Sequence, residues 1–165
     1  MQPAWREPVY GQFGAALDML ANAIEACPDS LWRDRARNPQ FWYVAYHTLF
    51  FTDFYLTETD EGFAPPTPFT LSELDPTGVL PDRVYEKAEL LRYLAHGRSR
   101  LRARLDSLDE ARAAERCRFE RRDLSELELM LYNLRHVQHH AAQLNLLLRQ
   151  VVDTAPGWVS RGGAG

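Results

Sequence analysis

The placement of proline constrains the fold of this chain more than any other feature of the sequence. Four prolines between residues 58 and 80, together with Gly62 and Gly78, exclude a continuous helix across that segment. On both sides of it, apolar residues recur every three or four positions, which is the pattern of amphipathic helices. The sequence therefore predicts helices on either side of one long irregular connection.

Four stretches carry the helical pattern, over about residues 8–26, 40–57, 81–105 and 126–152. Pro8 suits the first turn of the first stretch, and Asn38 with Pro39 suits the N-cap and first position of the second. Ser125 and Glu128 supply a capping box for the fourth. The second stretch is apolar on nearly all sides, so we expect it to be a central helix or to meet a partner subunit.

The segment 58–80 is long enough to return along the second predicted helix. At roughly 3.3 Å per extended residue it could cover twice the ~29 Å length of that helix. We therefore predict an all-α fold, a four-helix bundle with a long crossover connection between helices 2 and 3. We expect one domain over residues 1–153 and a Gly-rich C-terminal tail over 154–165, which Trp158 could anchor.

Composition excludes several classes of partner. The net charge of -4 gives no general attraction to nucleic acids or anionic membranes. The N-terminus lacks a signal-peptide pattern, and no apolar run is long enough to span a bilayer. Cys27 and Cys117 have no metal-finger or redox spacing. We expect a cytoplasmic protein that acts on a small molecule, without nucleic acid or membrane as partner.

Three histidines carry the candidate chemistry. His136 and His140 are four residues apart, so in a helix they share one face beside the buried stripe, whereas His139 faces away. His47 lies in the apolar second stretch. Neutral imidazole binds transition metals, and three protein ligands leave a coordination position for water or substrate. The spacing indicates a three-histidine metal site in a pocket at the edge of the bundle.

Ordinary structural roles stay open on these residues alone. A histidine pair at this spacing can arise on any helix, and a single histidine among aromatic residues can be a hydrogen-bonded core residue. His96 is a weaker candidate for the third ligand, because Gly97 and Arg98 place it on a charged part of its helix. The motifs of zincins, ferritin-like di-iron bundles, serine hydrolases and P-loop proteins are absent.

A histidine in an aromatic second helix, followed in the fourth helix by the run from His136 to Leu144, resembles the DinB-like superfamily over nearly the whole chain. The resemblance implies that His47, His136 and His140 bind a divalent metal. Many members have Asn before the first histidine of the run and Arg-Gly after the last. This chain has Arg135 and Ala141-Ala142 there, so the surroundings of the ligands differ.

The resemblance also implies an activity. Members with an assigned function include thiol-dependent S-transferases and a thiol-dependent isomerase, so the expected reaction is transfer of a low-molecular-weight thiol to an electrophile. The expected metal is zinc or nickel, with iron and manganese as alternatives, and a homodimer is expected. Tyr43 and Gln143 are candidate substrate-binding residues. A metal-dependent hydrolase and a non-catalytic bundle for ligand binding or dimerisation are the alternative functions.

Overall fold

The computed structural model describes residues 2–119 and 121–163, and its long elements are all helices. Four of them form a bundle: α1 (Arg6–Ala26), α3 (Phe41–Tyr55), α4 (Lys87–Ser107) and α6 (Glu126–Val152). Two short helices, α2 (Asp29–Trp32) and α5 (Glu110–Ala114), and the 3₁₀ helix η1 (Leu71–Leu74) lie in the connections. The predicted all-α bundle is confirmed. In the described part of the chain, no helix is both long and apolar enough to cross a bilayer.

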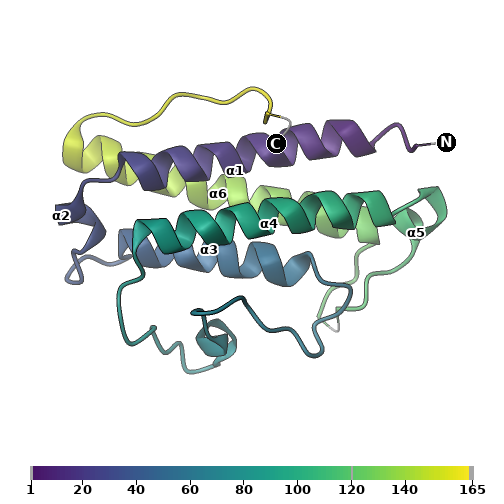
Figure 1. The fold of residues 1–165 in the computed structure, drawn as a ribbon, viewed down its shortest axis with the longest axis horizontal. Coiled ribbons are helices and arrows are strands. Elements are labelled where there is room, and N and C mark those ends of the chain that lie inside the picture. The colour runs from purple at the N-terminus through teal and green to yellow at the C-terminus, as the bar shows by residue number, and fades with distance from the viewer. Residues whose placement is uncertain (1, 120, 164–165) are drawn as a thin grey trace.

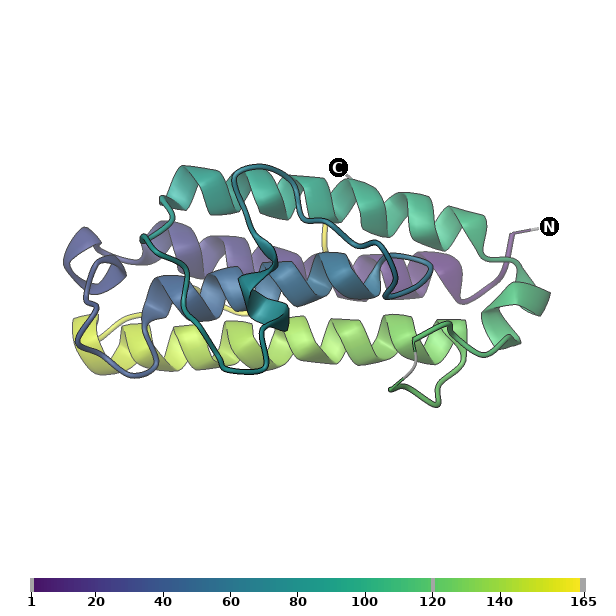
Figure 2. The same ribbon diagram turned by 90° about the horizontal axis from the view of Figure 1, so that it is seen from below.

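The four long helices pack around one core. Helices α1 and α3 each pack against both α4 and α6, so α1 and α3 lie on one diagonal of the bundle. Helices α3 and α4 start at the same end of the bundle (Figures 1 and 2). Residues 56–86 run from the end of α3 back to the start of α4, along the outside of α3. The long connection therefore has η1 lying over the middle of α3.

Aromatic rings fasten the connection to α3 and α4. Tyr46 of α3 is fully buried and stacks on Phe69, with ring centroids 5.7 Å apart, and Phe69 stacks in turn on Tyr93 of α4 at 4.4 Å. The Tyr46 hydroxyl donates a hydrogen bond to the carbonyl of Thr70 at 3.1 Å. Because these contacts immediately precede η1, they fix where that turn lies on the bundle.

Two helix starts differ from the sequence prediction. Helix α4 begins at Lys87 rather than near residue 81, because Glu86 and Glu89 form a capping box there. Trp32 also donates a hydrogen bond to the carbonyl of Tyr85 at 3.0 Å, which holds the preceding residues in an extended path. Helix α3 begins after Gln40, so Asn38 is not its N-cap. The capping box of Ser125 and Glu128 at the start of α6 is confirmed.

The C-terminal segment after α6 runs back along α1 (Figure 1). Trp158 does not anchor it, since this side chain is 74% exposed. Two hydrogen bonds hold the segment: the N–H of Gly162 donates to the carbonyl of Gly11 at 2.8 Å, and Nε2 of Gln12 donates to the carbonyl of Ser160 at 3.1 Å. A Cβ atom on Gly162 would lie 2.4 Å from the carbonyl carbon of Gly14, so only glycine allows this approach.

Candidate metal centre

Packing of α3 against α6 brings three histidines together. His47 projects from α3, and His136 and His140 project from successive turns of α6. The ring centroid of His47 lies 5.5 Å from that of His136 and 5.0 Å from that of His140, and the two α6 rings are 4.6 Å apart. One nitrogen of each ring lies within 4.8 Å of the other two, so a single ion could contact all three. His139 is exposed and lies outside this cluster, and so does His96.

In two of the three rings, the remaining nitrogen is held by a hydrogen-bond acceptor. Nδ1 of His47 lies 2.7 Å from Oε2 of Glu73, and Nδ1 of His140 lies 2.7 Å from Oε1 of Gln143. An acceptor at one ring nitrogen fixes the proton there and leaves a lone pair on the other. In His47 and His140 the free lone pair is therefore on Nε2.

Nε2 of His136 gives a direct test of whether the cluster suits a metal. This nitrogen is buried, and no residue in the described ranges forms a hydrogen bond with it. A buried acceptor without a partner costs about 1–3 kcal/mol, so the arrangement is unfavourable unless something occupies the space between the rings. Three neutral imidazole nitrogens are a suitable donor set for a divalent transition metal. The residues present fit such an ion.

The electrostatics of the cluster favour neutral rings. Burial, followed by the neighbouring histidines His140 and His47, lowers the pKa of His136 from 6.5 to about 3. Burial also lowers the pKa of His140. Both α6 rings are therefore uncharged at neutral pH, which is the form that binds a metal.

Glu73 is the residue of this site that the sequence analysis missed. It lies in η1 of the long connection, and its side chain is only 2% exposed. The connection carries no periodic pattern that could place Glu73. The one signal in the sequence was the length of the connection, which is sufficient to return along α3 past His47. Glu73 closes the site from outside the bundle.

The two candidate substrate-binding residues lie beside the histidines. The Tyr43 ring is 6.2 Å from that of His47, one turn along α3. Burial and the nearby charge of Glu73 raise the pKa of the Tyr43 hydroxyl to about 12, so it stays protonated. Gln143 is held between two histidines, since its Oε1 accepts from His140 and its Nε2 donates to Nε2 of His139 at 3.2 Å.

Comparison with known proteins agrees with this arrangement. The model of the DinB superfamily matches residues 12–144, which include all three histidines. The chain belongs to the DinB superfamily. No curated protein and no solved structure matches it. The family assignment therefore comes from the family model alone, and the histidine cluster of this DinB-superfamily chain is an independent observation.

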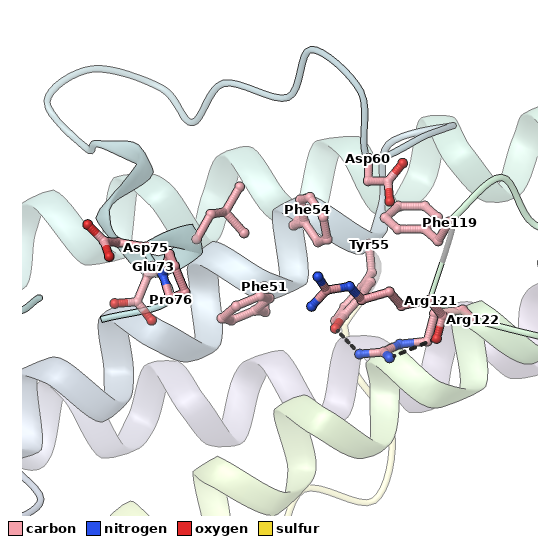
Figure 3. A pocket seen from close by; sticks show the side chains of 11 residues that line it. Phe51, Phe54, Tyr55, Asp60, Glu73, Asp75, Pro76, Phe119, Arg121 and Arg122 are labelled. Atoms are coloured by element: carbon pink, nitrogen blue, oxygen red, sulfur yellow. Dashed lines mark hydrogen bonds between the residues drawn. The ribbon is translucent and has the colours of Figure 1, made fainter. Parts of the chain in front are cut away.

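A pocket of about 480 Å³ lies next to the histidines. Phe51 is the wall that the pocket and the cluster share: its ring lies 4.9 Å from that of His47 and 6.1 Å from that of His136. Glu73 and Asp75 lie at one end of the pocket, and Arg121 and Arg122 lie at the other end (Figure 3). The remaining lining is mostly aromatic and apolar: Phe54, Tyr55, Leu74, Pro76 and Phe119, with Asp60 beside Phe119.

A second hollow, of about 540 Å³, lies on the outer side of α6. His136 lines it together with His139 and Arg135. The candidate centre is therefore flanked by two hollows, of which only the first includes Glu73.

Proposed function

We propose that this DinB-superfamily chain is a metal-dependent enzyme in which His47, His136 and His140 hold a divalent transition metal. The observation that supports the proposal most is the convergence of three ring nitrogens within 4.8 Å, with the His47 and His140 rings each oriented by an acceptor at Nδ1. A structural role alone would not require a buried Nε2 on His136 without a partner. Zinc or nickel is the proposed ion, with iron and manganese as alternatives.

The proposed reaction is the transfer of a low-molecular-weight thiol to an electrophilic small molecule. A divalent ion in such a site lowers the pKa of a thiol that binds to it and so supplies a nucleophile at neutral pH. Three protein ligands leave room for that sulfur. The aromatic pocket beside Phe51 offers a packing surface for the apolar part of a substrate.

The side chains around the ligands have defined parts in this proposal. Glu73 accepts the Nδ1 proton of His47 and so increases the basicity of that ligand. Gln143 orients His140 in the same way through its amide oxygen. Tyr43 keeps its proton and faces Glu73, so we propose that it helps to hold this carboxylate and offers a hydroxyl to the substrate. The expected cytoplasmic location and homodimer remain predictions.

Metal analysis of protein purified without a polyhistidine tag tests the first part of the proposal. We expect close to one metal ion per chain in the wild type and loss of that metal in His47→Ala and His136→Ala, with helix content unchanged by circular dichroism. Wild-type protein that stays metal-free after incubation with zinc, nickel, manganese and iron would refute the metal centre and leave the non-catalytic bundle.

Turnover by the metal-loaded protein tests the second part. A panel of electrophiles is offered with and without a small thiol. We expect metal-dependent turnover only when the thiol is present. Metal-dependent turnover without a thiol would instead identify the protein as a hydrolase that uses a metal-activated water.

A further inference from the structure

The end of the pocket away from Glu73 holds two arginines that the proposed reaction does not explain, with Asp60 close to them. Arg121 and Arg122 belong to the loop between α5 and α6, and both line the pocket. Figure 3 shows their side chains at the opposite end from Glu73, with the Phe51 ring between. Two adjacent guanidinium groups at one end of an aromatic pocket are suited to an anionic group.

Among the described residues, these two arginines have no ion pair with a carboxylate, whereas most other arginines do. Within residues 2–119 and 121–163, ten arginines form ion pairs with acidic side chains: Arg6, Arg33, Arg37, Arg83, Arg98, Arg100, Arg102, Arg104, Arg112 and Arg116. In the same ranges no ion pair joins a carboxylate to Arg121 or Arg122.

Arg122 is held in place by neutral groups. It donates to the hydroxyl of Tyr55 at 2.9 Å and to that of Tyr132 at 3.2 Å. Its Nε is buried, and no described residue accepts a hydrogen bond from it. A cation that is fixed by neutral acceptors keeps its full charge for an anion that enters from the pocket.

Tyr55 sets the distance between the arginine end of the pocket and the histidines. Its ring centroid lies 6.5 Å from that of His136 and 5.7 Å from the guanidinium carbon of Arg122. The His136 ring and the Arg122 guanidinium are therefore at most about 12 Å apart, a span that a small ligand with an aromatic ring and a polar group at each end could bridge. Its apolar part would pack against Phe51, Phe54 and Phe119.

We infer that the pocket takes a small anionic substrate, with a carboxylate or phosphate on Arg121 and Arg122 and an apolar body against the aromatic walls. The inference rests on the proposed function, because it names the substrate class of the same site. It places the reactive end of the substrate at the histidines and the charged end away from them.

Titration calorimetry with three small probes tests this inference. Benzoate, phenyl phosphate and neutral benzamide are titrated into the zinc-loaded protein and into the apoprotein. We expect one of the two anions to bind about 10-fold more tightly than benzamide, the scale of one charge-assisted hydrogen bond. That preference should shrink at high salt, and the tighter of the two anions identifies the group that the arginines accept.

Three variants locate the effect. Arg121→Gln removes an exposed guanidinium and should reduce anion binding about 3- to 10-fold without affecting folding. Arg122→Gln should reduce it at least as much. Arg135→Gln is the matched control, because Arg135 is also exposed and close to His136 but lines the other hollow.

The outcomes separate this inference from the metal proposal. Equal binding of all three probes, no binding at all, or a loss in Arg135→Gln alone would overturn the anion site even if zinc binds. An anion preference that depends on Arg121 in protein that takes up no metal would support the anion site and reject the metal centre.

Discussion

The carboxylate of Glu73 lies 2.7 Å from Nδ1 of His47, although 26 positions of sequence separate the two residues. Glu73 reaches this position because the long connection is fastened to α3 by the stacked rings of Tyr46 and Phe69. A carboxylate on the far nitrogen of a ligating histidine fixes its tautomer and increases its basicity. The connection therefore contributes to the candidate metal centre as well as joining two helices.

Replacing Glu73 should weaken metal binding while the bundle stays folded. In Glu73→Gln the side chain keeps its size but loses the negative charge that faces His47, so we expect metal affinity to fall about 10- to 100-fold. Competition with a chelator of known affinity measures this change. Asp82→Asn is the control, since it removes an exposed acidic group of the same connection that lines a different hollow from Glu73. Equal affinities in wild type and Glu73→Gln would show that Glu73 does not act on the ligand.

Two neighbouring histidines of α6 should behave differently. His140→Ala removes a ring from the cluster, so metal content should fall to background, whereas His139→Ala removes an exposed ring and should change affinity less than about 3-fold. The small effect reflects the hydrogen bond by which His139 helps to hold Gln143. Elemental analysis after dialysis compares the two variants. Similar losses in both would mean that the bound metal does not lie between the three rings.

The sequence predicted the parts of this site that lie on regular helices. His136 and His140 could be placed together because a helix repeats every 3.6 residues, and the apolar pattern around His47 indicated a second helix that faces the core. The capping box at Ser125 could be located because it is a local signal.

Residues on irregular segments could not be placed in this way. Glu73 and Arg121 lie in connections, where position depends on distant packing rather than on a repeating pattern. Helix α4 starts five residues after Asp82 because the capping box at Glu86 and a hydrogen bond from Trp32 hold the preceding residues extended. The backbone approach of Gly162 to α1 is equally a tertiary feature.

The start of α4 should make stability depend on pH in the acidic range. The hydrogen-bonded pairing with Arg83 lowers the pKa of Glu89 from 4.5 to about 2, and the N–H of Glu86 contributes. Between about pH 2 and pH 4.5, the folded protein therefore binds fewer protons than the unfolded chain. This stabilisation is present above about pH 4.5 and is lost as the pH falls towards about 2.

Urea unfolding of wild type and Glu89→Gln measures this contribution. We expect the variant to be less stable at pH 7 by about 1–2 kcal/mol, and the difference to disappear as the pH approaches 2. Glu25→Gln is the control, because Glu25 is exposed and forms no ion pair within the described residues. A difference between wild type and Glu89→Gln that does not vary with pH would show that the charge of Glu89 does not cap α4.

The docking of the C-terminal segment on α1 should depend on the absence of a side chain at Gly162. A methyl group there would overlap the backbone of Gly14 and Ala15, so Gly162→Ala should break the hydrogen bond to Gly11 and release the segment. We expect the free energy of unfolding to fall by about 1–2 kcal/mol. The loss cannot exceed what docking of the segment contributes, because the four long helices can stay packed without it. Gly163→Ala is the matched control, since a Cβ there meets nothing within 4 Å. Limited proteolysis should cleave the segment faster in Gly162→Ala only, and equal cleavage of the two variants would mean that this approach does not hold it on α1.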